Sequence, residues 1–139
     1  MAIKMRILYA TKKAKLITMA GLLNEEFQLS VNSVDRIPPA YSCDRERLLI
    51  LILSIKGDLD NQTRLFCREI TKERAQNTAL IIDGSEADAQ KVISLLKEAG
   101  TTTITNVHYV KGGLPFLKGV SAEEKDALLK WAHSVVDTL

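Results

Sequence analysis

The chain has 139 residues, of which 46% are hydrophobic and 26% charged, a balance typical of a globular domain with its own core. Its 19 basic and 17 acidic residues give a formal net charge of +2, which argues against the concentrated basic surface of a nucleic-acid-binding protein. The longest apolar run, Leu48–Leu53, is far shorter than the roughly 20 residues of a membrane span, so we expect one cytoplasmic domain over residues 1–139 that does not bind membranes.

Five apolar runs recur along the chain and predict β-strands. They cover residues 4–10, 27–34, 47–55, 78–83 and 103–110. The first, third and fourth contain MRILYA, LLILILSI and TALIID, without the polar alternation of a half-exposed strand. Continuous apolar runs are typical of strands buried on both faces, so we expect these three at the centre of a sheet.

Four helical patterns lie between and after these runs, each with apolar residues three and four apart. Their apolar faces are Leu16, Met19, Ala20 and Leu23; Leu65, Phe66, Ile70 and Ala75; Ala89, Val92, Ile93 and Leu96; and Leu128, Leu129, Ala132, Val135 and Val136. The predicted start signals are Thr11; Asp60 or Asn61; Ser85 with Asp88; and Ser121 with Glu124. Gly100 should end the third helix, and Pro38 and Pro39 keep residues 36–41 out of a helix interior.

Strands that alternate with helices predict a parallel sheet with right-handed crossovers. The expected fold is a three-layer α/β/α domain with five parallel strands in the order 2-1-3-4-5. Sheets of this kind bind ligands at the carboxyl ends of their strands, beside the switch point between the first and third strands. The loops that should meet there cover residues 11–15, 54–60 and 83–86.

The turn after the first predicted strand has charges that attract an anion but lacks the glycine of a phosphate-binding loop. It reads Thr11, Lys12, Lys13, Ala14, Lys15. A helix N-terminus offers free N–H groups and a positive dipole end, and lysines add to its attraction for an anion. The turn has no glycine, however, so it lacks the residue that lets a phosphate approach the backbone closely. A solvated turn beside a helix is the simpler interpretation of the same lysines.

Three segments resemble the flavodoxin-like superfamily in pattern and order, and together they span nearly all of the chain. They are RILYATKKAKLITMAGLL, LLILILSIKGDLDNQTRLFCREI and TNVHYVKGGLPF followed by a terminal helix. Members that bind FMN hold its phosphate with a loop of the form T/S-x-T-G-x-T. Aligned on Tyr9, this chain keeps Thr11 at the first hydroxyl position but has Lys13 at the second, Ala14 for the glycine and Leu16 for the final threonine.

These replacements predict that tight FMN binding is lost. Each missing hydroxyl removes a charge-assisted hydrogen bond of about 1.5–3 kcal/mol, so two cost about two to four decades of affinity. The loops expected beside the flavin ring also carry no aromatic side chain to stack on it. Their candidate residues are Ser54, Ile55, Lys56, Gly57 and Asp58 after the third strand, and Asp83, Gly84 and Ser85 after the fourth.

We therefore predict a flavodoxin-like domain without a tightly bound cofactor, whose former cofactor edge binds a small anion or a protein partner, including a second copy of the chain. The alternative is a working FMN protein that transfers electrons or acts as an oxidoreductase. In that case Thr11, Lys12, Lys13 and Lys15 would hold the phosphate, and residues 54–58 would lie near the flavin ring.

The sequence lacks the residue patterns of a metal site and of other functions found on this type of fold. The two cysteines and two histidines have no metal-ligand spacing and predict reduced thiols, Cys67 packed in a helix and Cys43 exposed near the prolines. Tyr109 and Trp131 are expected in the core. The chain lacks the acidic pair of a receiver domain, the Cys and Arg of a cysteine phosphatase loop and the G-x-G-x-x-G fingerprint. No catalytic residue is assigned.

Overall fold

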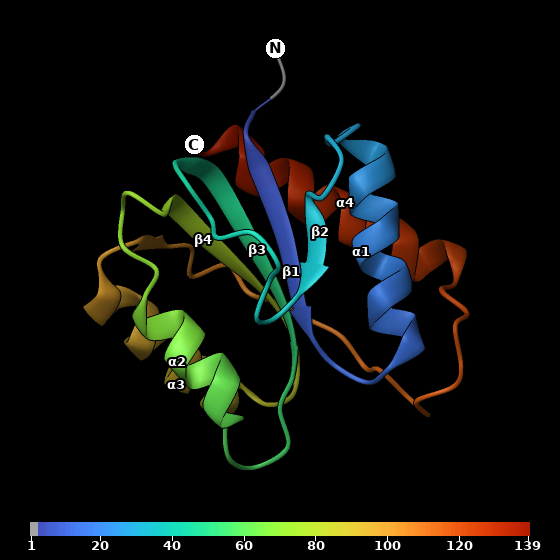
Figure 1. Cartoon of the computed structure of the whole chain (residues 1–139). Coiled ribbons are helices and arrows are strands. Elements are labelled where there is room, and N and C mark those ends of the chain that lie inside the picture. The colour runs from blue at the N-terminus through green and yellow to red at the C-terminus, as the bar shows by residue number, and fades with distance from the viewer. Residues whose placement is uncertain (1–2) are drawn as a thin grey trace.

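The computed structural model describes residues 3–139 as one parallel sheet between two layers of helices (Figure 1). The strands are β1 (Met5–Ala10), β2 (Val34–Arg36), β3 (Glu46–Ser54), β4 (Ala75–Asp83), β5 (Thr102–Thr103) and β6 (His108–Tyr109). The helices are α1 (Ala14–Glu26), α2 (Asn61–Arg68), α3 (Glu86–Ala99) and α4 (Ala122–Asp137). The strand order is β2-β1-β3-β4-β5, with β6 also paired to β4. The predicted α/β/α architecture and strand order are confirmed.

The three continuous apolar runs form the central strands because their side chains pack against helices on both faces of the sheet. In β3, Ile50 and Ile52 lie in the apolar cluster with α1 and α4, whereas Leu51 and Leu53 lie in the cluster with α2 and α3. Figure 1 shows the same division, with α1 and α4 on one side of the sheet and α2 and α3 on the other. All strand pairs are parallel, so the carboxyl ends of β1, β3 and β4 lie at one edge.

Two predicted strands differ from the structure. Residues 27–34 are mostly turn, because α1 runs on to Glu26 and both Gln28 and Asn32 have positive φ values, of 48° and 68°, that a strand does not allow. The last predicted strand is divided into β5 and β6. Between them, the carbonyl of Asn106 accepts a hydrogen bond of 2.7 Å from the Trp131 indole and does not pair with β4.

Most of the predicted helix starts and the predicted end of α3 are confirmed. Ser85 and Ser121 form capping boxes with Asp88 and Glu124, Asp60 caps α2, and Gly100 ends α3 with a φ of 117°. The first signal was wrong: α1 has Lys13 at its N-cap, two residues after Thr11. The second apolar face is confirmed only in part: Phe66 and Ile70 pack in the cluster with α2 and α3, but the other two residues do not form this face. Leu65 is half exposed and Ala75 belongs to β4, while Thr63 and Cys67 are the buried residues of α2.

Three smaller expectations can also be compared with the structure. Cys43 and Cys67 are free thiols, but Cys43 is buried rather than exposed. Burial raises the pKa of Cys67 to about 12, and burial also raises the pKa of Cys43, so both thiolates are disfavoured. Trp131 is buried as expected, whereas Tyr109 is largely exposed. Within residues 3–139, no helix has the length and apolarity that crossing a bilayer requires.

Candidate functional site

The carboxyl edge of the sheet brings the ends of β1, β3 and β4 into direct contact. The hydroxyls of Thr11 and Ser54 lie 2.6 Å apart, and Ser54 donates a hydrogen bond of 3.2 Å to Asp83 Oδ2. The sequence-based expectation that the loops after these strands meet is therefore fulfilled for these three side chains. Each of them, however, is already hydrogen-bonded to another.

Lys13 is held in the same network. Its Nζ donates to Asp83 Oδ2 at 2.5 Å, in a partly buried ion pair. Gly112, from the loop after β6, packs directly on this pair: a Cβ at that position would lie 2.3 Å from Lys13 Cδ and 2.7 Å from Asp83 Oδ2. The loop thus covers the lysine that takes the place of a phosphate-loop hydroxyl, and the cation is matched by a carboxylate of the protein itself.

The N-terminus of α1 is partly occupied by groups of the protein itself. The Ala14 N–H donates to the carbonyl of Pro115 at 2.9 Å, and the Lys13 N–H donates to Thr11 Oγ1 at 3.0 Å. Helix N-termini attract anions because their first N–H groups have no partner within the helix. Here two such donors at the start of α1 are used by the chain, one of them by the loop after β6.

The remaining lysines of the turn lie in different surroundings. Lys15 forms an ion pair with Glu124, the residue that also completes the capping box of α4. The Lys15 ammonium, with the backbone N–H of Ser121, lowers the pKa of the Glu124 carboxyl. Lys12 is exposed and makes no ion pair within the described part of the chain. It is therefore the lysine of the turn with its charge available to a ligand.

Not all the candidate residues gather at this site. Ile55 lines the hollow described below, but Lys56 and Asp58 form a small bridge on either side of Gly57, whose φ is 80°. The Gly57 carbonyl accepts a hydrogen bond of 3.0 Å from Lys91 of α3. Gly84 packs against the Ile55 carbonyl, and Ser85 is engaged in capping α3. Lys56, Gly57, Asp58, Gly84 and Ser85 do not line that hollow.

A cavity of about 670 Å³ opens between the turn after β1, the end of β2 and the start of α2. Its cations are Lys12, Lys13 and Arg36, and its one carboxylate, Asp60, caps α2. Its apolar lining is contributed by Tyr9, Ala10, Ile17, Ile37, Leu53, Ile55, Leu59 and Pro115. Ligand pockets commonly have volumes of roughly 300–1,000 Å³ and combine an apolar wall with a few polar groups, as this one does.

Sequence reasoning missed three residues that shape this edge. Gly112 and Pro115 were read only as part of a closing strand and loop, and Glu124 only as a cap. The sole signal of Gly112 and Pro115 in the sequence is the Gly-Gly-x-Pro run at residues 112–115, which indicates a tight loop but not what the loop covers.

Two solved structures match nearly the whole chain. The Streptococcus pneumonia TIGR4 flavodoxin aligns with a TM-score of 0.70 and 12% identity, over 97% of this chain and 99% of that one. The chain has the flavodoxin-like fold. A flavodoxin from the domain Archaea aligns with a TM-score of 0.64 and 11% identity, over 98% of each chain. No protein-family model and no curated protein matches the flavodoxin-like chain by sequence.

Proposed function

We propose that this flavodoxin-like chain is a binding domain that holds a small organic anion in the cavity at its carboxyl edge and does not hold FMN tightly. The observation that carries the proposal is the partly occupied N-terminus of α1, where the Ala14 N–H donates to Pro115 and Lys13 pairs with Asp83. An FMN phosphate at this position would have to displace the Pro115 carbonyl and approach the Asp83 carboxylate. The residues present therefore do not fit that group.

The charge and lining of the cavity support an anion of another kind. Lys12 and Arg36 line it and make no ion pair within residues 3–139, so they outnumber the one carboxylate, Asp60. The apolar wall between them, which includes Tyr9 and Ile37, suits the hydrocarbon part of a ligand. A carboxylate or phosphate monoester on an aromatic or aliphatic body matches both features.

A protein partner at the same edge would find an apolar surface on the loop after β6. Leu114, Phe116 and Leu117 are exposed on either side of Pro115, the residue whose carbonyl closes α1. A partner that drew this loop away would free the Ala14 N–H. Partner binding and anion binding at this edge would then be coupled.

FMN binding with electron transfer is the second candidate function, and the similarity of the whole chain to two flavodoxins favours it. It requires the Pro115 carbonyl to leave Ala14 so that Thr11, Lys12 and the helix N-terminus face the phosphate. The flavin would supply the redox chemistry, and these residues would bind and orient its phosphate.

Phenyl phosphate is a suitable probe of the proposed anion site. We expect its addition to shift the backbone amide signals of Lys12 and Ile37 in ¹H–¹⁵N spectra, with saturation at a Kd of about 1 mM or tighter. Lys12→Gln should weaken binding about fivefold, as loss of about 1 kcal/mol would. Lys97→Gln, near the end of α3, is the matched control and should bind normally. Equal binding by the Lys12→Gln variant, or shifts that do not saturate, would contradict the proposal.

A further inference from the structure

The loop after β6 presents apolar side chains to solvent beside the carboxyl-edge cavity. Eight large hydrophobic side chains are exposed in residues 3–139, and three of them fall within four positions of this loop. They are Leu114, Phe116 and Leu117, with exposed fractions of 55%, 72% and 50%. Exposed apolar residues that are scattered singly need no explanation, but a cluster of this kind is typical of an interaction surface.

An ordered turn carries this apolar cluster. The Leu117 N–H donates to the carbonyl of Leu114 at 3.1 Å, which closes a β-turn with Pro115 at its second position, where the fixed φ of proline is favourable. The Pro115 carbonyl in turn accepts a hydrogen bond of 2.9 Å from the Ala14 N–H. Phe116 therefore projects from a turn that is anchored to the start of α1, and a partner that packs on it has little backbone to order.

Cations without a carboxylate partner lie around this turn. Lys111 and Lys118 flank it in the chain, and both are exposed and make no ion pair within the described residues. The neighbouring cavity, which shares Pro115 with the turn, adds Lys12 and Arg36. The two carboxylates that contact the turn after β1 already pair with its other lysines. The carboxyl edge is therefore apolar at the projecting turn and basic around it.

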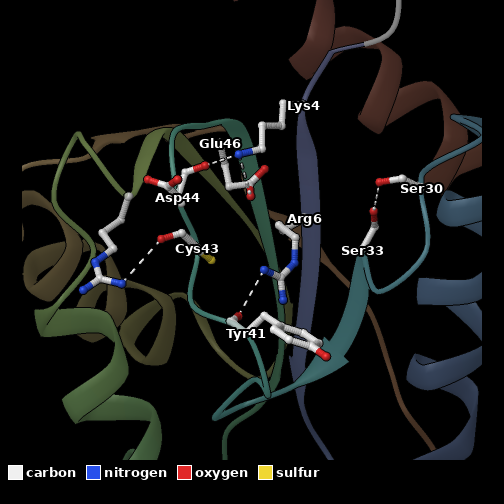
Figure 2. A network of polar contacts seen from close by, with 9 residues as sticks. Lys4, Arg6, Ser30, Ser33, Tyr41, Cys43, Asp44 and Glu46 are labelled. Atoms are coloured by element: carbon white, nitrogen blue, oxygen red, sulfur yellow. Dashed lines mark hydrogen bonds and ion pairs between the residues drawn. The ribbon is translucent and has the colours of Figure 1, made fainter.

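The opposite, amino edge of the sheet offers no comparable surface. Arg6 of β1 is only 8% exposed, and its Nη1 donates to the carbonyl of Tyr41 at 3.2 Å (Figure 2). The Nε and Nη2 atoms of Arg6 and the Oε2 atom of Glu46 have no hydrogen-bond partner within the described residues, but all three atoms are shielded from solvent. A ligand in the adjoining hollow cannot reach them, so these charges do not form a binding surface.

We propose that the carboxyl edge docks an acidic, apolar segment of a partner protein. An apolar side chain of the segment packs on Phe116 and its two leucine neighbours, and one of its carboxylates enters the cavity toward Lys12 and Arg36. This inference rests on the proposed function, because it takes the anion of that cavity to be an Asp or Glu side chain of a partner.

The charges and the shape of this edge favour such a segment over two other occupants. A second copy joined through the same face would bring Lys111 and Lys118 of both copies together, and like charges at an interface oppose association. An anionic membrane would attract these lysines, but a flat bilayer contacts the projecting turn rather than the lining of a cavity of about 670 Å³. A polypeptide segment can contact both the turn and the cations in the cavity.

Three matched peptides test the docking surface in ¹H–¹⁵N spectra of the full chain. The first is acetyl-Glu-Glu-Leu-Phe-Glu-Glu-Leu amide, the second has Gln in place of each Glu, and the third has Ser in place of each Leu and Phe. We expect the first peptide to shift the backbone amide signals of Lys12 and Phe116 together, with saturation at a Kd of about 1 mM or tighter. Each of the other two should bind at least about tenfold more weakly.

Substitutions separate the apolar contact from the charge. Phe116→Ser should weaken binding of the first peptide about tenfold, as loss of an interface anchor does, and Val31→Ser, at an exposed position of the amino edge, should leave it unchanged. Lys118→Gln should weaken binding of the first peptide but not of the Gln peptide. Phe116 is largely exposed and does not line the cavity, so Phe116→Ser should keep the fold and the affinity for phenyl phosphate.

Phenyl phosphate also separates the failure of this inference from that of the proposed function. Saturable binding of phenyl phosphate without binding of the first peptide would overturn the docking proposal alone, whereas loss of both would overturn the proposed function as well. Equal binding of the Gln peptide, or of the first peptide by the Phe116→Ser variant, would contradict docking. Sedimentation with phosphatidylserine vesicles but no peptide binding would assign the surface to a membrane, and a dimer that Phe116→Ser abolishes would assign it to a second copy.

Discussion

The two edges of the sheet use their charged side chains in opposite ways. At the carboxyl edge, Lys13, Asp83 and Ser54 bond to one another, and the loop after β6 occupies the helix N–H that an anion would use. At the amino edge, Arg6 and Glu46 are more deeply buried, yet each retains a polar atom with no partner in the described chain. At the carboxyl edge, where sheets of this kind bind ligands, the polar groups are partly occupied by other groups of the protein. The amino edge has more buried polar atoms without a hydrogen-bond partner.

This contrast has an energetic meaning. Hydrogen bonds within a buried network stabilise a fold, whereas a buried donor or acceptor without a partner costs about 1–3 kcal/mol. The carboxyl edge should therefore lose stability when its members are altered, and the amino edge should gain it. Substitutions at each edge test this expected difference in stability.

Gly112→Ala should give the largest loss. The added Cβ would lie 2.3 Å from Lys13 Cδ and 2.7 Å from Asp83 Oδ2, so the ion pair beneath the loop must move. Overpacking of this kind costs about 1–3 kcal/mol, to be measured by urea denaturation. Gly21→Ala in α1, where no atom lies within 4 Å, is the control and should raise stability by about 0.5–1 kcal/mol. Unchanged stability of the Gly112→Ala variant would mean that the loop does not close on this pair.

Arg6→Met should stabilise the protein. The substitution removes a buried guanidinium that makes a single hydrogen bond among the described residues, and it keeps much of the side-chain volume. Replacing poorly paired buried charge with apolar groups is often neutral or stabilising by about 1–4 kcal/mol, and we expect the lower end of that range. Arg47→Met, at an exposed position of β3, should be near neutral. A clear loss of stability specific to Arg6→Met would show that the guanidinium is satisfied after all.

Asp83→Asn should destabilise the protein by about 1 kcal/mol, because it removes the charge that matches Lys13 while keeping the shape of the side chain. The pair is only partly buried, and solvent screening keeps the loss at the low end. Asp126→Asn removes a comparable ion pair with Lys130 that is exposed on α4, and it should have almost no effect. Equal melting temperatures for the two variants would show that the network at the carboxyl edge adds nothing.

Acid should affect the two edges in opposite directions. The pKa of Glu46 is raised above 4.5 by burial, so its ionised form weakens the fold, and Glu46→Gln should raise stability at pH 7 with the gain disappearing below about pH 4.5. The pKa of Glu124 is lowered by Lys15, so its contribution is present above 4.5 and is lost as pH falls through the lowered value. Glu124→Gln should therefore reduce stability at pH 7 and not in strong acid. Parallel pH profiles for the two variants would contradict this account.

The sequence predicted the carboxyl edge because general rules of parallel sheets locate it. Continuous apolar runs identified β1, β3 and β4, and the loops after them followed from the direction of the strands. The sequence does not locate β2, since the positive φ values at Gln28 and Asn32 belong to the turn that follows α1. Short edge strands have too little pattern to separate them from turns.

The hydrogen bonds and ion pairs at the two edges could not be predicted from the sequence. In the sequence, the lysines of the first turn predict an anion site. The residues that contact this turn in the structure, Asp83, Glu124 and Pro115, lie 70 or more positions further along the chain. Arg6 and Glu46 sit in strands whose pattern predicts nothing about charge. Unpaired atoms are visible only when all neighbours are placed, so the amino edge gave no signal.

We propose above that the carboxyl edge does not hold FMN tightly. The direct test of this proposal is the visible absorption spectrum of the purified protein, followed by fluorescence titration of FMN and of riboflavin with the protein. We predict a colourless preparation and no saturable quenching of FMN below about 10 μM, since the missing hydroxyl groups cost about two decades or more of affinity. A yellow preparation, or quenching of FMN but not riboflavin that saturates in the low micromolar range, would contradict the account and establish FMN binding.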